Sequence, residues 1–80
     1  MPKSPRFTPS PLRIEILAFE RVQLLDVAGP LQVFASANDL VTAAGNARPY
    51  EPIVVAQRSQ VTTSAGLGLA AQEKIGRAHV

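Results

Sequence analysis

The segment LRIEILAF, residues 12–19, decides the fold class of this chain. It begins with partial alternation of apolar and charged residues and ends in the continuous apolar run 16–19. A short apolar run of this kind is typical of a parallel strand that is covered on both faces. A buried helical segment is the alternative, but the run is short and Pro11 precedes it. We therefore predict a central parallel strand over residues 12–19.

The segment that follows predicts a helix and the loop leading to it. Pro30 suits the first turn of a helix, Gly29 can occupy the N-cap, and Gly45 offers a left-handed stop. Between them, apolar residues recur at three- and four-residue spacing and form one apolar face. These residues are Val33, Phe34, Ala37, Leu40, Val41 and Ala44. We predict a helix over residues 30–44, preceded by the loop 20–28.

A second strand is predicted over residues 51–56, with Pro52 at its beginning or on an edge, because proline cannot donate to a sheet. The segments 61–64 and 67–71 flank Gly66 and predict a short extended ribbon. Strand, helix and strand together form a βαβ unit. One helix cannot cover both faces of such a sheet, so we expect that most of the sheet is missing and that the α/β fold is incomplete.

The composition excludes several classes of protein. The chain has 80 residues and no cysteine, so it holds no disulfide, no zinc–thiolate site and no cysteine nucleophile. With 46% hydrophobic and 18% charged residues it is typical of a globular domain. No apolar run approaches the roughly 20 residues of a membrane helix. The proline-rich residues 1–11 predict a disordered leader without the apolar region of a secretory signal, and we expect a cytoplasmic protein.

The last residues, IGRAHV (75–80), do not continue the α/β pattern. The DNA string ATCGGAAGAGCACACGTC encodes them and matches part of a widely used sequencing adapter, whose preceding AG fits the end of a Lys74 codon. We therefore interpret residues 74–80 as an adapter-encoded tail. The net charge of +2 then comes from Lys74 and Arg77, which argues against a nucleic-acid-binding surface. His79, the one histidine, lacks a second ligand, so no metal site is expected.

The most specific motif lies in LLDVAGPLQVFASAN, residues 24–38, where Asp26, Gly29 and Pro30 form a D-x-x-G-P pattern. Placed after the strand RIEILAF, it resembles the start of the ThiJ/PfpI group of the class I glutamine amidotransferase-like superfamily. The resemblance continues through YEPIVVAQRSQVTTSAGLGLAAQ and covers residues 12–73. Within this group the chain resembles the N-terminal domain of AraC-type transcriptional regulators, in which a helix-turn-helix DNA-binding domain follows.

The resemblance implies a flavodoxin-like doubly wound sheet in a three-layer sandwich, of which this chain holds the first βαβ unit. It implies that the intact parent binds a small-molecule effector at the carboxyl ends of its strands. DNA would be bound through the missing C-terminal domain, and the parent can be a homo-oligomer. No cofactor and no metal are implied, and no membrane is involved. The fragment itself is expected to be inactive.

Asp26, Gly29 and Pro30 are the candidate residues of the ligand pocket. Asp26 matches the acid that lies beside an elbow cysteine in the family's catalytic members. That cysteine would follow residue 80, so this chain has no catalytic residues. Asp26 can equally orient the start of the helix, where negative charge is favourable, and Gly29 and Pro30 are most simply structural.

Two other functions remain open on this pattern. The D-x-x-G-P motif also occurs in stand-alone ThiJ/PfpI-type enzymes, such as isocyanide hydratases or related cysteine hydrolases. A non-catalytic ligand-binding or interaction domain is the third possibility. The segment SAGLGLAA, residues 64–71, lacks the third glycine of a dinucleotide fingerprint and is interpreted as a bend. Thr62, Thr63 and Ser64 have no base nearby in the sequence and are not expected to be nucleophiles.

Overall fold

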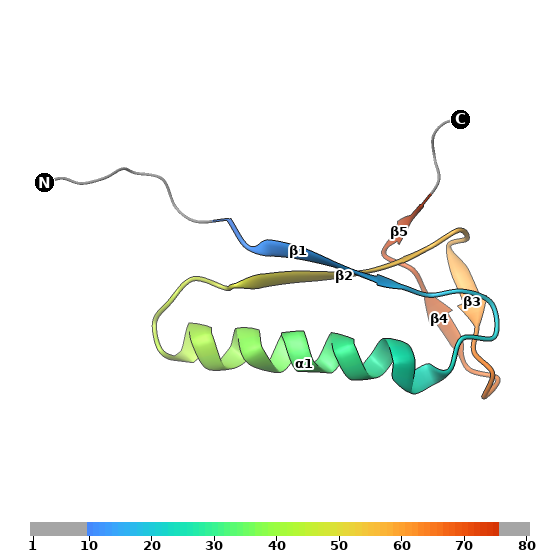
Figure 1. Ribbon diagram of the computed structural model, residues 1–80, viewed down its shortest axis with the longest axis horizontal. Coiled ribbons are helices and arrows are strands. Elements are labelled where there is room, and N and C mark those ends of the chain that lie inside the picture. Colours follow the sequence, from blue (N-terminus) through green and yellow to red (C-terminus); the bar gives the residue numbers. More distant parts are fainter. Residues whose placement is uncertain (1–9, 76–80) are drawn as a thin grey trace, which may run out of the picture.

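Residues 10–75 are described by a computed structural model, shown in Figure 1. In chain order the elements are strand β1 (Leu12–Leu17), helix α1 (Leu24–Ala43), and strands β2 (Tyr50–Ala56), β3 (Gln60–Thr62), β4 (Gly68–Ala70) and β5 (Glu73–Lys74). The fold is mixed α/β, as predicted. Most of the expected leader and the end of the tail, residues 1–9 and 76–80, lie outside the described residues.

Strands β1 and β2 are parallel neighbours, which confirms the predicted βαβ arrangement. Their register runs from Leu12 opposite Tyr50 to Leu17 opposite Val55. Strand β5 lies on the other side of β2 and is also parallel to it. It pairs only with the last two residues of β2, Val55 and Ala56. The resulting order β1-β2-β5 leaves β1 at one edge of the sheet. Strand β5 was not predicted, because two polar residues show no hydrophobic period.

Helix α1 runs along one face of the sheet and covers it (Figure 1). The buried core between them consists of small aliphatic residues: Ile16, Ala18, Val22, Val27, Val54, Ala56 and Val61. No helix of residues 10–75 covers the opposite face, and the side chains of Leu17 and Phe19 are each 54% exposed. The prediction that the first strand, β1, is covered on both faces is therefore wrong for the described part of the chain. The exposed apolar residues agree with the expectation of an incomplete sheet.

The helix begins at Leu24 and not at Pro30, so the predicted start was wrong. Gln23 is the N-cap residue, with extended backbone and no capping hydrogen bond from its side chain. Pro30 lies inside the helix, and Gly29 does not cap it. The region predicted as the loop 20–28 therefore consists of a short turn followed by the first turns of α1.

Burial explains why the helix extends across a proline. Val27 is 3% exposed and belongs to the core, and Leu31 packs against the same cluster. Pro30 cannot donate a backbone hydrogen bond to the carbonyl of Asp26 and disturbs the helix there. Removing the side chains of Val27 and Leu31 from water stabilises the helical path enough to offset this loss.

The end of the helix agrees with the prediction to one residue. Helix α1 ends at Ala43, and Gly45 adopts the left-handed conformation at φ +90°. The Gly45 N–H donates to the carbonyl of Thr42 at 2.9 Å. The predicted apolar face was only partly right, because Val33 and Leu40 are 64% and 74% exposed. No helix among residues 10–75 is both long and apolar enough to cross a membrane.

Two side-chain amides close the outer edge of β2. Asn38 donates from Nδ2 to the Tyr50 carbonyl at 3.0 Å and accepts the Tyr50 N–H on Oδ1 at 3.0 Å. The side chain of Gln72 accepts the Val54 N–H on Oε1 at 2.7 Å, and the backbone N–H of Gln72 donates to the Val54 carbonyl at 2.8 Å. Pro52 lies between these two clamps on the same side of the strand. Its missing N–H therefore faces a locally unpaired edge, as predicted.

Strands β3 and β4 form the predicted short ribbon around Gly66, and the structure shows that they pair antiparallel. Gly66 has φ +91°, a conformation that glycine adopts without steric cost. Thr63 is 1% exposed and fixes the turn, since its N–H donates to the Leu67 carbonyl at 2.8 Å and its Oγ1 accepts the Leu67 N–H at 3.1 Å. The interpretation of this segment as a bend is confirmed.

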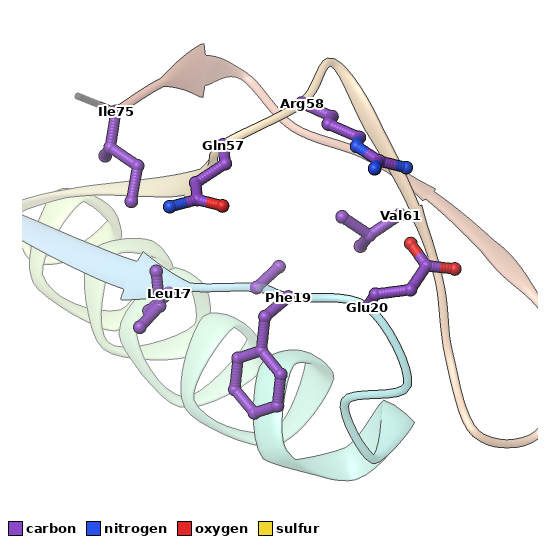
Figure 2. A pocket seen from close by; sticks show the side chains of 8 residues that line it. Leu17, Phe19, Glu20, Gln57, Arg58, Val61 and Ile75 are labelled. Atoms are coloured by element: carbon purple, nitrogen blue, oxygen red, sulfur yellow. The ribbon is translucent and has the colours of Figure 1, made fainter. Parts of the chain in front are cut away.

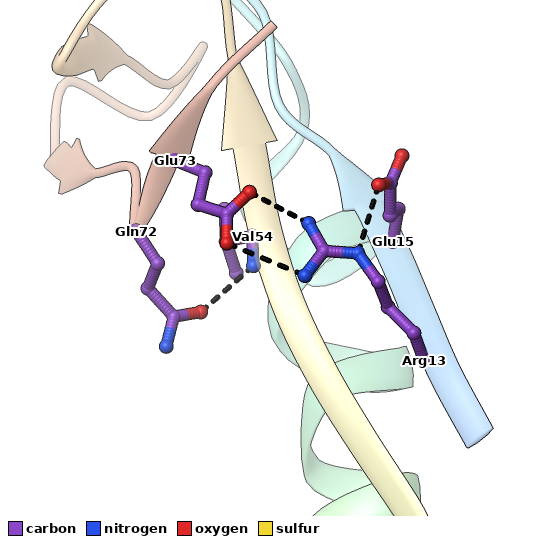
Figure 3. Close-up of polar contacts among 5 residues, drawn as sticks. All are labelled: Arg13, Glu15, Val54, Gln72 and Glu73. Atoms are coloured by element: carbon purple, nitrogen blue, oxygen red, sulfur yellow. Dashed lines mark hydrogen bonds and ion pairs between the residues drawn. The ribbon is translucent and has the colours of Figure 1, made fainter. Parts of the chain in front are cut away.

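A network of charged side chains joins the two edge strands of the sheet, β1 and β5, across β2 (Figure 3). Arg13 donates from Nη2 and Nη1 to the two carboxylate oxygens of Glu73 at 2.7 and 3.3 Å, and from Nε to Glu15 at 3.0 Å. These hydrogen bonds lower the pKa of Glu73 and raise the pKa of Arg13. Because the groups are exposed, the network contributes little to stability.

Candidate functional site

The carboxyl ends of β1 and β2 surround a hollow of about 370 Å³ (Figure 2). Parallel strands bring their carboxyl ends to one side of a sheet, where ligands bind in open α/β folds. The lining comes from the last residue of β1 and the segment after it, the segment after β2, strand β3 and the residue after β5. It consists of Leu17, Ala18, Phe19, Glu20, Gln57, Arg58, Val61 and Ile75.

Main-chain hydrogen bonds fix the loop that forms one wall of this hollow. The Arg21 N–H donates to the Thr62 carbonyl at 2.7 Å, and the Val22 N–H donates to the Phe19 carbonyl at 3.0 Å. Arg21 adopts φ +68°, which turns the chain sharply from β1 toward α1. The Ser64 N–H then donates to the Val22 carbonyl at 3.0 Å. The loop after β1 is thus bonded to the β3–β4 ribbon.

The hollow combines an apolar floor with a few polar groups. Glu20 and Arg58 lie at one end, on either side of Val61, and the Gln57 amide lies toward Ile75 (Figure 2). The Glu20 carboxylate accepts the Thr62 N–H, with both oxygens at 3.3 Å. Within residues 10–75, Arg58 forms no ion pair. Such a site can hold a small amphipathic molecule.

No chemical step can be assigned to these groups. The chain has no cysteine, and His79 lies outside the described residues. The hydroxyl of Thr63 is buried and bonded within its own turn, which supports its structural role. Among residues 10–75, no group of three or more His, Cys, Asp or Glu side chains is placed to hold a metal ion. The residues that line the hollow, all within residues 10–75, include no nucleophile–base pair.

The three candidate pocket residues lie on the first turns of α1 and do not line the hollow. Asp26 is exposed in the first turn, where its charge faces the positive end of the helix dipole. Gly29 is half-buried, and a Cβ added there would meet no atom within 4 Å. Pro30 is exposed on the helix surface. Among the described residues, Glu20 and Arg58 line the hollow without any of these three residues.

Sequence reasoning missed Glu20 and Arg58. Glu20 falls at the start of the predicted loop 20–28, and Arg58 lies two residues after the predicted strand 51–56. Their signal was positional, because each follows closely after the end of a predicted parallel strand. Residues at that position meet at one edge of the sheet.

The described part of the tail, Lys74 and Ile75, joins the sheet. Lys74 lies in β5, and the Ile75 N–H donates to the Ala56 carbonyl at 2.8 Å. These are main-chain contacts that other residues could also make, so they do not test the adapter interpretation, which stays a prediction. If that interpretation holds, the parent carries a different side chain where Ile75 lines the hollow.

Comparisons of this chain with protein-family models, with curated proteins and with solved structures found no match.

Proposed function

We propose that residues 12–73 are the N-terminal part of an amidotransferase-like sensor domain from an AraC-type transcriptional regulator. The finer fold of the parent is then flavodoxin-like, with the present sheet as its first βαβ unit. The parent binds a small-molecule effector in this domain and DNA through a C-terminal helix-turn-helix, as a homo-oligomer in the cytoplasm. The 80-residue chain performs neither function.

The observation that carries this proposal is the D-x-x-G-P pattern on the first turns of a helix between two parallel strands. The Asp26 carboxylate is exposed at the carboxyl end of β1 and forms no ion pair within residues 10–75. It is therefore available to a group that the rest of the parent would supply. The hollow beside β1 and β2 adds support, because it lies where α/β sheets bind ligands.

The test is specific DNA binding by the intact parent. We expect the purified parent to retard labelled DNA from upstream of its own gene at fixed salt. Unlabelled DNA of the same sequence should displace the labelled DNA from the protein better than a scrambled sequence does. The 80-residue chain should retard neither. A parent that binds no DNA and hydrates isocyanides through an elbow cysteine would contradict the proposal and support the stand-alone enzyme.

A further inference from the structure

Strand β1 presents an open hydrogen-bonding edge. The N–H groups of Leu12 and Ala18 donate toward the β2 side at 2.9 and 2.8 Å. Because backbone groups alternate along a strand, the even-numbered residues face β2 and the odd-numbered residues face outward. The outward N–H and C=O groups belong to Arg13, Glu15 and Leu17. No strand of residues 10–75 pairs with them.

The other edges of the described sheet are closed or short. Asn38, Pro52 and Gln72 block the outer side of β2 before β5 begins. Strand β5 has two residues, and β3 and β4 have three each. An unpaired strand edge is a template for pairing with another chain. In the described part of the chain, β1 is the one long edge that offers such a template.

The β1 edge is complementary to itself. If a second copy lies antiparallel with Ile14 facing its equivalent, each Arg13 lies opposite the Glu15 of the other copy. Opposite charges at facing positions stabilise an antiparallel pair, and like charges destabilise it. If the pairing is shifted by two residues in either direction, Arg13 lies opposite Arg13 or Glu15 lies opposite Glu15, and the facing charges repel. The charges therefore select one register.

The apolar side chains agree with the same register. On the α1 side of the sheet, Ile14 faces its equivalent and Leu12 faces Ile16 of the other copy. Leu12 is 61% exposed in the single chain, so this pairing would bury apolar surface. Helix α1 packs mainly against β2 and leaves the β1 edge accessible.

We propose that the β1 edge binds a second copy of this chain, through antiparallel pairing of the two β1 strands across a twofold axis at Ile14. The two sheets then form one continuous sheet. This pairing belongs to the 80-residue chain and does not rest on the proposed function. In a parent with a complete sheet, a strand of that parent would cover the same edge.

A single introduced cysteine tests the pairing, because the chain has no cysteine of its own. In the proposed register the two residues 14 form a non-hydrogen-bonded pair with Cα atoms about 4.5 Å apart, within the range of a disulfide. The Ile14→Cys chain, refolded at micromolar concentration and oxidised, should run as a disulfide-linked dimer on an unreduced gel. Leu17→Cys is the control, because its two copies would lie about 20 Å apart. Leu17 is also the more exposed position.

Equal cross-linking of Ile14→Cys and Leu17→Cys would overturn the proposal, since it would show unspecific association. No cross-linking of either chain would also overturn it.

Charge reversal gives a second, independent test by sedimentation. Arg13→Glu and Glu15→Arg should each weaken the dimer roughly tenfold or more, because both cross-strand pairs become repulsive. A mixture of the two variants should form a heterodimer, since each acidic strand then faces a basic one. Arg13→Glu also loses the bond to Glu73 within the chain, and mixing does not restore that bond. A mixture that stays monomeric, or a single variant that still dimerises like the parent chain, would contradict the proposed register.

Discussion

Replacing Pro30 with alanine is expected to raise the free energy of unfolding by about 2 kcal/mol. The new N–H can donate to the carbonyl of Asp26, a bond that proline cannot make inside a helix. Pro30 is exposed, so its ring contributes little packing that would be lost. The gain stays below the full difference of about 3 kcal/mol between the two residues, because alanine also gives the unfolded chain more freedom. Urea unfolding followed by circular dichroism, at fixed chain concentration, measures it.

Gly29→Ala is the matched control on the neighbouring residue. A Cβ at this position meets open space, so the substitution should stabilise the helix by about 0.5–1 kcal/mol. If the helix began at Pro30 instead, Gly29 would be its N-cap and alanine there would destabilise the chain. Loss of stability in both variants would therefore contradict the helix start at Leu24.

Replacing Asn38 with alanine is expected to lower the free energy of unfolding by about 2–3 kcal/mol. Asn38 is 8% exposed, and its amide makes two hydrogen bonds, both to the backbone of Tyr50. Alanine leaves the Tyr50 N–H without a partner at the start of β2, and the Tyr50 carbonyl keeps only the exposed Arg48 Nη1 as a donor, at 3.1 Å. The same substitution removes a link that holds α1 against the sheet. Urea unfolding under the conditions used for Pro30→Ala measures this loss.

Two variants separate the hydrogen bonds from other effects at this site. Asp39→Ala changes the exposed neighbour on the same helix and should alter stability by less than about 0.5 kcal/mol. Asn38→Asp keeps an acceptor for the Tyr50 N–H but turns a carboxylate oxygen toward the Tyr50 carbonyl in a buried position, so at pH 7 its loss should be at least as large as that of Asn38→Ala. If Asn38→Ala were as mild as Asp39→Ala, the amide clamp on Tyr50 would not exist in solution.

The strands could be predicted because their signals are local. Residues 12–19 and 51–56 are short apolar runs, and each corresponds to an observed strand within two residues at either end. Gly45 and Gly66 marked a helix end and a turn correctly, since both need a positive φ. The open face of the sheet also followed from the sequence, because one helix cannot cover two faces.

The helix start could not be predicted from local rules, because tertiary burial overrides them. Gly29 and Pro30 are typical of a helix beginning, but the buried positions Val27 and Leu31 favour continuing the helix through the proline. The face of α1 was misjudged for a related reason. Asn38, a polar residue, occupies a buried position of that face because the backbone of Tyr50 satisfies its amide.

The candidate site was predicted only in its general place. The carboxyl ends of the strands do form a hollow, as the α/β arrangement implies. Its polar residues Glu20 and Arg58 were not predicted, because they come together only when β1 and β2 are adjacent in space. Asp26 lies in the first turn of α1, outside the lining of the hollow. Its expected partner, a cysteine, is not among the 80 residues.

The most direct test of the central claim is a nucleotide read of source genomic DNA. The read is primed within the codons for Leu12 to Phe34 and continues past codon 80. We predict that the codons for residues 75–80 are absent and that the frame continues through an amidotransferase-like domain into a helix-turn-helix. A genome that contains ATCGGAAGAGCACACGTC followed by a stop codon would contradict the account. The 80 residues would then be the natural product, and their open sheet would need a partner chain to complete it.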